Sequence, residues 1–278
     1  MQSRRFRQVD VFASAPYRGN PVAVVVDGEG LDDALMKAFT RWTNLSEATF
    51  ILPPRDTRAD YRLRIFTAAR ELPFAGHPTL GSAHAWLEAG GVPASEGRVV
   101  QECEAGLIDV RRDGERLAFA APPLRREGPV AAELAGRIVR GLRVDPDWVR
   151  AMRWVDNGPG WVGVLLDSAR HVLDLDVDRG LLHGLDVGVI GAHPKGGPAD
   201  FEARAFFTGD GVLEDPVTGS LNASLAQWLI GEGLAPSCYR VRQGTAIGRA
   251  GLVDIAKDGA RIWVGGACVT CIAGSVQL

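Results

Sequence analysis

Residues 77–87 read HPTLGSAHAWL, and residues 215–225 read DPVTGSLNASL. The two stretches align without a gap and share the pattern His/Asp-Pro-x-x-Gly-Ser-x-x-Ala-x-Leu. In each stretch a polar residue precedes a proline, and the residues after the proline have helical spacing. This pattern predicts a helix that begins at the proline. Self-similarity within a chain is the sequence signature of a repeated structural unit. We interpret the two stretches as the prominent helices of one lobe that occurs twice.

Strand-like runs surround both stretches. The first half has helical spacing over 31–42 and 78–89, and apolar or alternating runs over 7–12, 21–26, 48–52, 61–66, 99–103, 107–111 and 116–120. The second half repeats this mixture, with helices expected over 131–139, 177–182 and 216–230 between further strands. Strands with one prominent helix per half predict an α+β fold of two similar lobes.

The boundary between the lobes is expected where turn residues and charges separate two structured regions. Residues 122–129, PPLRREGP, have that composition and are the best linker in the chain. The expected domains are therefore 1–122 and 129–269, with the strand near 270–278 as a possible completion of the N-terminal lobe. A length of 278 residues agrees with two domains, because one domain usually takes about 100–200 residues.

Composition excludes several partners. The chain has 31 Lys+Arg against 34 Asp+Glu, for a formal net charge of −3. Nucleic-acid binding needs clustered Lys and Arg that neutralise phosphates, so no nucleic-acid partner is expected. The sequence has neither an apolar leader nor a window of about 18 uninterrupted apolar residues. We therefore predict a cytoplasmic protein with no membrane partner.

The cysteines and histidines lack the spacing of a disulfide framework or a metal site. Cys268 and Cys271 are three residues apart on an expected strand, so they point to opposite faces. Residues 157–163 contain GxGxxG, but a strand follows where a dinucleotide site has a helix, and we interpret them as a hairpin turn. GxSxG, P-loop and HExxH motifs are missing from the sequence. We expect neither a metal nor a cofactor.

Three polar residues are candidates for chemistry. His77 and Asp215 precede the two expected helices, whose free N–H groups and macrodipoles attract anions. The alternatives are that Asp215 is an N-cap and that His77 is an ordinary loop residue. Glu47 stands directly before the apolar strand 48–52, where it is either solvated or tucked into a cleft. Burial there would raise the pKa of Glu47 toward the value that a general acid/base needs at neutral pH.

Several motifs, in order along the chain, resemble the phenazine-biosynthesis PhzF-like isomerase family. They read RGNP at 18–21, LSEATF at 45–50, ELPFAGHPTLG at 71–81 and EDPVTGS at 214–220, followed by QG at 243–244, GR at 248–249 and VGG at 264–266. The resemblance extends over essentially the whole chain. Separate motifs in the correct order make it specific.

The resemblance implies the diaminopimelate-epimerase fold. That fold has two pseudo-symmetric lobes, each a β-sheet curled around a central helix, with the active site in the cleft between them. Epimerases of this fold use one cysteine from each lobe, near the starts of the central helices. Here those stretches read FAGH at 74–77 and DPVT at 215–218, without a cysteine. Racemisation by two thiols is therefore not expected.

The resemblance also assigns catalytic roles. The functional residues of the family map onto Glu47, His77, Asp215 and Ser220. By resemblance, Glu47 is the proton shuttle, His77 and Asp215 form a polar pair that relays or holds protons, and Ser220 donates a hydrogen bond to the substrate. A desolvated base within reach of an activated C–H group fits this chemistry.

The implied partner is a small molecule that carries a carboxylate. The amides of Gly76, Thr218 and Gly219 would hold that carboxylate at the helix starts, and Asn20 would line the cleft. Residues 249–251 read Arg-Ala-Gly where many family members have Arg-Pro-Ser. This departure leaves the identity of the substrate open.

The leading prediction is a cofactor-independent isomerase that moves a proton, and hence a double bond, in a small cyclic or aromatic-like carboxylate. The known case in the family is the isomerisation of trans-2,3-dihydro-3-hydroxyanthranilate. One alternative is an epimerase of the same fold, which returns the proton to the same carbon and needs a second acid such as Asp215. Another alternative is a non-catalytic protein that binds a small molecule. The family suggests a homodimer.

Overall fold

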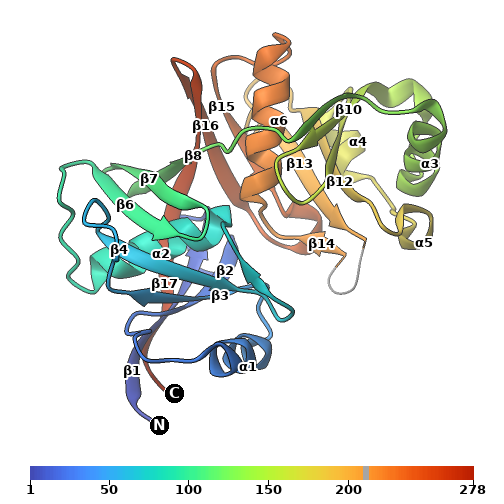
Figure 1. Ribbon diagram of the computed structural model, residues 1–278. Coiled ribbons are helices and arrows are strands. Elements are labelled where there is room, and N and C mark those ends of the chain that lie inside the picture. Colours follow the sequence, from blue (N-terminus) through green and yellow to red (C-terminus); the bar gives the residue numbers. More distant parts are fainter. Residues whose placement is uncertain (209–212) are drawn as a thin grey trace. The chain divides into compact units, whose positions relative to one another are not determined.

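The chain folds as two compact units. The structure is a computed structural model, and it describes residues 1–208 and 213–278 (Figure 1). Unit 1 consists of residues 1–120 and 265–278, and unit 2 consists of residues 121–264. The sequence places the corresponding boundaries at 122 and near 270.

The strands of unit 1 form a ring. From β17 (Arg261–Gln277) the pairing runs antiparallel to β1 (Ser3–Val11), antiparallel to β2 (Asn20–Val25) and parallel to β3 (Ala48–Leu52). It continues antiparallel to β4 (Tyr61–Phe66), parallel to β6 (Arg98–Cys103), and antiparallel to β7 (Gly106–Asp113) and β8 (Arg116–Ala120). β8 pairs with β17 and closes the ring, and the short β5 (Glu71–Leu72) adds to β4. Closure leaves no long strand edge unpaired.

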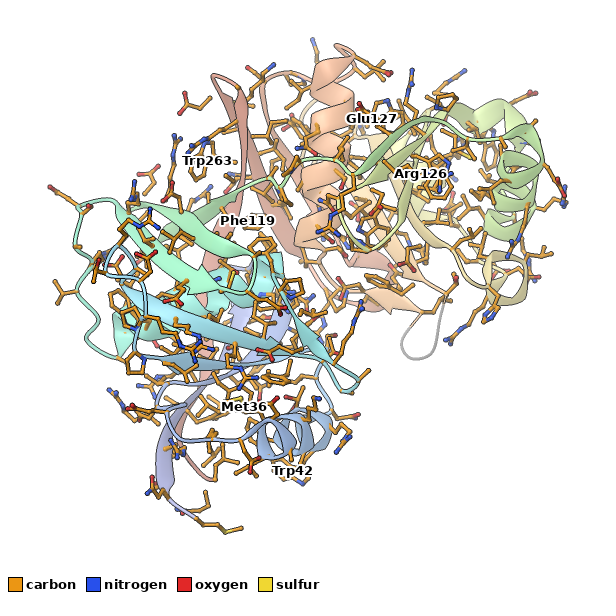
Figure 2. All side chains as sticks on the ribbon, in the orientation of Figure 1. Met36, Trp42, Phe119, Arg126, Glu127 and Trp263 are labelled. Atoms are coloured by element: carbon orange, nitrogen blue, oxygen red, sulfur yellow. The ribbon has the colours of Figure 1, made fainter. Side chains whose placement is uncertain are left out.

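Helix α2 (Gly76–Glu88) fills this ring, and it contacts β1, β2, β3, β4, β6 and β8. Residues 76–83 and Ala85 of the helix are buried, which explains why its first two turns consist mainly of apolar or small residues. Gly81 permits the close approach to the sheet, because a Cβ atom there would lie 2.4 Å from Cγ1 of Val22. Helix α1 (Asp33–Thr43) packs on the other face of the sheet, with Met36 buried and Trp42 exposed (Figure 2).

Unit 2 has its own sheet. β9 (Arg126–Pro129) pairs antiparallel with β10 (Val149–Asp156), β10 with β11 (Trp161–Leu166), and β11 in parallel with β12 (Asp186–Ala192). β12 pairs antiparallel with β13 (Phe201–Phe207), β13 in parallel with β15 (Cys238–Gln243), and β15 antiparallel with β16 (Gly251–Asp258). The short β14 (Glu214–Asp215) adds to β13.

Helix α6 (Gly219–Gly231) contacts β10, β11 and β16 of this sheet. The smaller helices of unit 2 are α3 (Ala132–Leu142), α4 (Ala169–Leu173) and α5 (Arg179–Leu182), with the 3-10 turns η1 (Pro146–Trp148) and η2 (Thr245–Ile247). Their buried residues, such as Ile138 and Val172, share a core with Val187 and Val189 of β12. Gly188 lies between these two valines and faces α6 instead, since a Cβ atom there would lie 2.1 Å from Cδ1 of Leu221. The sheet of unit 2 is therefore covered on both faces.

The two units repeat one order of strand pairings, which confirms the prediction of an α+β fold built from two similar lobes. In each unit the order is antiparallel, antiparallel, parallel, antiparallel, parallel, antiparallel. In each unit a two-residue strand also precedes the prominent helix.

The predicted helix starts are wrong in detail. α2 begins at Gly76, so His77 lies inside its first turn, and α6 begins at Gly219, four residues after Asp215. The gapless sequence alignment therefore does not superimpose the two helices. Pro216 lies outside α6 because residues 214 and 215 are used by β14, and only the chain after Thr218 is free to turn into a helix.

The predicted linker is also partly wrong. Residues 126–129 form β9, which pairs with residues 153–156 of β10. Gly128 has a φ of 105°, a conformation that side chains other than glycine rarely adopt. The turn-forming residues 126–129 therefore belong to an edge strand of unit 2, and only the part of the predicted linker before residue 126 lies in the connection between β8 and β9.

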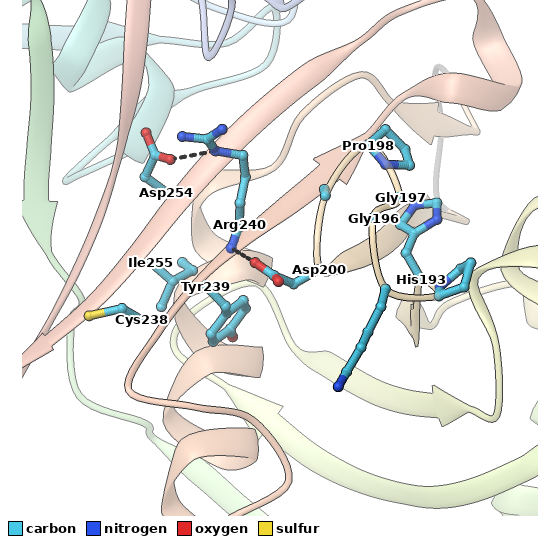
Figure 3. A pocket seen from close by; sticks show the side chains of 13 residues that line it. His193, Gly196, Gly197, Pro198, Asp200, Cys238, Tyr239, Arg240, Asp254 and Ile255 are labelled. Carbon is cyan, nitrogen blue, oxygen red and sulfur yellow. Dashed lines mark hydrogen bonds and ion pairs between the residues drawn. The ribbon is translucent and has the colours of Figure 1, made fainter.

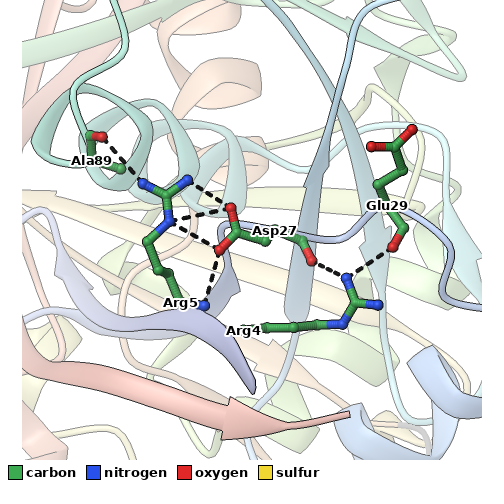
Figure 4. A network of polar contacts seen from close by, with 5 residues as sticks. All are labelled: Arg4, Arg5, Asp27, Glu29 and Ala89. Atoms are coloured by element: carbon green, nitrogen blue, oxygen red, sulfur yellow. Dashed lines mark hydrogen bonds and ion pairs between the residues drawn. The ribbon is translucent and has the colours of Figure 1, made fainter. Parts of the chain in front are cut away.

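A polar network fastens the first strand of unit 1. Arg5 holds the carboxylate of Asp27 through its guanidinium, with a shortest N–O distance of 2.6 Å, and also donates to the carbonyl of Ala89 (Figure 4). The buried Arg4 donates to the carbonyls of Asp27 and Glu29. These contacts tie β1 to the loop after β2 and to the end of α2.

The CxxC stretch lies in β17. Cys268 is buried, and Cys271 is partly exposed at an irregularity in the pairing with β1. Burial raises the pKa of Cys268 to about 12, so its thiol is protonated at neutral pH. Within the described part of the chain, no helix is long and apolar enough to cross a membrane.

Candidate active site

Glu47 is held at the start of β3, as the sequence predicts. Its side chain is only 15% exposed, although Glu is usually solvated. One carboxylate oxygen, Oε2, lies 3.3 Å from Nε2 of His77. Of the two readings that the sequence leaves open for Glu47, the structure supports the withdrawn carboxylate.

His77 is placed by the first turn of α2. The helix is enclosed by the ring of strands, and the side chain of His77 is 8% exposed. Burial lowers the pKa of His77 to about 3, so its ring is neutral at pH 7. His77 is therefore a buried helical residue and not the ordinary loop residue of the alternative reading.

Asn20 completes a chain of three polar groups in unit 1. It is the first residue of β2 and is buried, with Nδ2 3.5 Å from Nδ1 of His77. The amide nitrogen can only donate, so Nδ1 accepts and the single ring proton is on Nε2, the atom that faces Glu47. The order is thus Asn20 to His77 to Glu47. Nε2 and Oε2 are close but do not have the geometry of a hydrogen bond, so the arrangement places a withdrawn carboxylate beside one N–H group.

The first turns of α2 and α6 have backbone N–H groups that no N-cap side chain satisfies. The N-caps of α2 and α6, Ala75 and Thr218, make no side-chain hydrogen bond to their helices, whereas Asp32, Ser168 and Asp178 cap α1, α4 and α5. An uncapped helix start leaves N–H groups that a ligand can satisfy.

These donors belong to predicted site residues. Among the described residues, the backbone N–H groups of Gly76 and His77 in α2, and of Gly219 and Ser220 in α6, have no hydrogen-bond acceptor. Anions are stabilised at such helix starts by both the N–H groups and the macrodipole. A carboxylate is the simplest group that fits either helix start.

Asp215 is not the N-cap that the alternative reading made it. Its Oδ2 accepts a hydrogen bond of 2.6 Å from the hydroxyl of Thr218, which holds the N-cap position. The fully buried Gln243 accepts from the Thr218 backbone N–H at 3.1 Å and donates to the Thr218 hydroxyl at 2.9 Å. Gln243 also donates to the Asp215 carbonyl at 3.2 Å. One side chain thus fixes the segment that carries Asp215. The prediction that the Thr218 amide holds a substrate carboxylate is wrong, because Gln243 already accepts from that N–H group.

Ser220 is positioned by the hairpin between β10 and β11. Trp161 donates from Nε1 to the Ser220 hydroxyl at 3.1 Å, and Asn157 donates to the Ser220 carbonyl at 2.9 Å. The hydroxyl is then an acceptor toward Trp161, and its own proton remains available to a ligand. Residues 157–160 connect β10 to β11, which confirms the hairpin interpretation of the GxGxxG stretch.

The structure brings the predicted residues together in two sets. Asn20, Glu47, Gly76 and His77 belong to unit 1, and Asp215, Thr218, Gly219 and Ser220 belong to unit 2. The pairing of His77 with Asp215 joins residues of different units and stays a prediction.

Sequence reasoning gave no role to the residues that support the second set. Trp161, Asn222 and Gln243 surround Thr218 and Ser220 through hydrogen bonds, including one of 2.8 Å from Asn222 Nδ2 to Gln243 Oε1. Gln243 stands in a matched family motif, which is the only signal that pointed to it. The contacts of Trp161 and Gln243 join residues more than twenty positions apart, and spacing along the chain does not reveal them.

One hollow lies outside these sets, in unit 2. It has a volume of about 580 Å³ and is bordered by the loop 193–200 and by β15 (Figure 3). In its wall, Nε2 of His193 lies 2.9 Å from the buried carboxylate of Glu202, and Arg240 contacts Asp254 at 2.8 Å. Among the described residues, no three His, Cys, Asp or Glu side chains lie close enough together to hold a metal ion.

Comparison with known proteins identifies relatives along the whole chain. A family model described as "Phenazine biosynthesis-like protein" (PhzC-PhzF) matches residues 9–274. The chain is 33% identical to trans-2,3-dihydro-3-hydroxyanthranilate isomerase of Pseudomonas fluorescens, over 97% of this chain and 98% of the relative. It is also 33% identical to a protein of Schizosaccharomyces pombe named Antisense-enhancing sequence 1, over 99% of both chains.

The fold has relatives among solved structures. A PhzF-family phenazine biosynthesis protein of Enterococcus faecalis is similar with a TM-score of 0.84 and 25% identity, over 100% of both chains. A probable proline racemase of Agrobacterium radiobacter is similar with a TM-score of 0.62 at 15% identity, over 99% of this chain and 92% of the other, which shows the fold alone. The matches in sequence, in motif order and in structure lead to one conclusion: the chain belongs to the phenazine biosynthesis-like (PhzC-PhzF) family.

Proposed function

We propose that this protein is a cofactor-independent isomerase that moves a proton, and with it a double bond, within a small cyclic carboxylate. The observation that carries the proposal is the polar chain of Asn20, His77 and Glu47. A carboxylate withdrawn from water and oriented by one N–H donor is a suitable general base. Curated relatives at 33% identity are named isomerases, which supports the same reaction class.

The proposed reaction needs only one proton carrier. Glu47 takes a proton from an activated carbon of the substrate, and the electron pair of the broken C–H bond delocalises into the adjacent double bond. Glu47 then returns the proton to the far carbon of that system, so that the double bond changes position. The Nε2–H group of His77 lies beside the carboxylate and keeps it oriented toward the substrate. Atoms and electrons balance without an oxidant or a cofactor.

The remaining site residues are proposed to bind the substrate or to position the residues that react with it. The open N–H groups of Gly76 and Gly219 are suited to a substrate carboxylate, and the hydroxyl proton of Ser220 is suited to an acceptor on the substrate. We propose that Asp215 and His77 form a polar pair that holds protons, while Glu47 alone carries the proton from carbon to carbon. Asn20 acts through His77 by fixing the tautomer of its ring.

Deuterium exchange tests the proposal. Wild-type protein is incubated in heavy water with trans-2,3-dihydro-3-hydroxyanthranilate, and carbon-bound deuterium is followed by NMR. We expect deuterium at a new carbon, and a loss of at least about a hundredfold in the exchange rate for Glu47→Gln, because removal of a general base typically costs 10²–10⁴-fold. The exposed Glu104 provides a control, and Glu104→Gln keeps the wild-type rate. Undiminished exchange in Glu47→Gln excludes Glu47 as the base.

The same measurement separates the alternative functions. Deuterium at the original carbon identifies an epimerase, and a ligand that is recovered unchanged identifies a binding protein. The homodimer and the cytoplasmic location stay predictions, and light scattering measures the first of them.

A further inference from the structure

Asp186 is a carboxylate without a role in the proposed reaction. It is the first residue of β12 and is partly buried. Burial, with a smaller contribution from the nearby Asp156, raises the pKa of Asp186 to about 6, while a main-chain hydrogen bond from Thr208 acts in the opposite direction. Within residues 1–208 and 213–278 no Lys, Arg or His forms an ion pair with it. A partly desolvated carboxylate without a cation is unusual, and perturbed groups of this kind cluster at functional sites.

The strand register places Asp186 on the face of the sheet that meets α6. Two residues further along β12, Gly188 faces α6, because a Cβ atom added at Gly188 would lie 2.1 Å from Cδ1 of Leu221. Residues two apart on a strand share a face. The side chain of Asp186 therefore lies on the same side as α6, at the end of the strand where the chain enters the sheet.

Two aromatic residues flank Asp186 on this face. Trp161 of β11 is its parallel partner and Phe207 of β13 is its antiparallel partner. Strands two apart in a sheet are separated by about 9.5 Å, yet the rings of Trp161 and Phe207 have centroids only 4.8 Å apart. The two rings thus converge across β12 at the level of Asp186.

The same tryptophan connects Asp186 to the proposed site. Nε1 of Trp161 donates to the hydroxyl of Ser220 at 3.1 Å, in the first turn of α6. Asp186, Trp161, Phe207 and Ser220 are consequently one contiguous group within unit 2. The group combines an anionic carboxylate and two aromatic rings with the open N–H groups of a helix start.

We propose that Asp186 is a specificity-determining residue, which binds a cationic amino group of the substrate while the start of α6 binds its carboxylate. The proposal rests on the proposed function. An ammonium group is attracted both by a carboxylate and by aromatic ring faces, and it supplies the positive charge that no described Lys, Arg or His gives to Asp186. The Asp186 carboxylate repels an anionic group at this position. A zwitterionic substrate is therefore bound in one orientation, with its amino group at Asp186 and its carboxylate at the start of α6.

A matched pair of ligands tests the assignment. Calorimetric titration at pH 7.5 compares trans-2-aminocyclohexanecarboxylate, whose amine is protonated, with cyclohexanecarboxylate, which lacks it. Wild-type protein is expected to bind the amino compound at least about tenfold more tightly, in the range of one charged hydrogen bond. In Asp186→Asn, a substitution of the same shape, the preference falls below about threefold while binding of cyclohexanecarboxylate is unchanged. Asp176→Asn, at an exposed aspartate of the same unit, keeps the wild-type preference.

Each outcome bears on a different claim. Equal binding of the two ligands by wild-type protein, or an equal loss of both in Asp186→Asn, overturns the role of Asp186 and leaves the carboxylate subsite standing. Failure of wild-type protein to bind either compound contradicts both the carboxylate subsite and the role of Asp186. Loss of exchange in Glu47→Gln is independent of all these results.

Discussion

The buried ring of His77 makes the stability of the protein depend on pH. In the folded chain the pKa of His77 is lowered to about 3 by burial, whereas in the unfolded chain it is about 6.5. As the pH falls, the unfolded chain therefore binds a proton before the folded chain does. The stabilisation from a neutral His77 is complete above pH 6.5 and is lost progressively between pH 6.5 and 3.

Replacement of His77 by Gln is expected to flatten this dependence. The free energy of unfolding of wild-type protein should decrease by up to about 1.4 kcal/mol per pH unit below pH 6.5 from this group alone. Urea unfolding at pH 7, 5.5 and 4.5 measures the slope for wild type, for His77→Gln and for His183→Gln at an exposed histidine. An identical slope in wild type and His77→Gln would show that His77 is solvated.

Asp186 has the opposite linkage. Its pKa is raised to about 6 in the folded chain, so the folded state binds its proton more tightly, and stability declines as the pH rises from about 4 to 6. Because the side chain is partly exposed, we expect Asp186→Asn to stabilise the protein at pH 7.5 by only about 1 kcal/mol. The gain should vanish near pH 3.5. Thermal unfolding at both pH values checks this, and destabilisation at pH 7.5 would contradict it.

At the scale of elements, α2 depends on the absence of a side chain at Gly81. A Cβ atom there would lie 2.4 Å from Cγ1 of Val22 and 3.0 Å from Cγ2 of Val11, both inside the ring. Gly81→Ala is therefore expected to destabilise the protein by about 1–3 kcal/mol, as overpacking does. In α3, a Cβ atom at Gly136 meets only the end of the flexible Arg140 side chain at 3.4 Å, so Gly136→Ala should stabilise by about 0.5–1 kcal/mol. Chemical denaturation of both variants measures the free energy of unfolding, which should fall in Gly81→Ala and rise in Gly136→Ala.

The elements themselves were largely predictable, because strands and helices follow local periodicity. The expected runs over 48–52 and 61–66 coincide with β3 and β4. The starts of α2 and α6 were missed because proline at a first helical turn is only a preference, and β14 claims the residues that precede Pro216. Glu47 was placed correctly, but its contact with His77 was not predicted, since the two residues are brought together by the packing of α2 against β3.

At the scale of the molecule, β17 decides whether unit 1 can close. Its residues 268–277 pair with β1, and it also pairs with β8. We expect a chain ending at residue 264 to lose amide hydrogen-exchange protection throughout β1 and β8, because both strands then have an unpaired edge. Protection of β11 to β13 in unit 2 should persist and serves as the internal control. Retained protection of β1 would mean that another strand replaces β17.

The order of synthesis gives this closing strand a further consequence. Residues 1–120 are translated long before residues 265–278, so the nascent chain carries most of unit 1 without the strand that seals it. Two open strand edges then coexist with a nearly finished sheet, and open edges pair readily with other chains. Unit 2, whose residues are contiguous, can mature on the ribosome first. The unit that contains residues 1–120 therefore closes only after residues 265–278 are made, and until then its open edges are available for pairing with other chains.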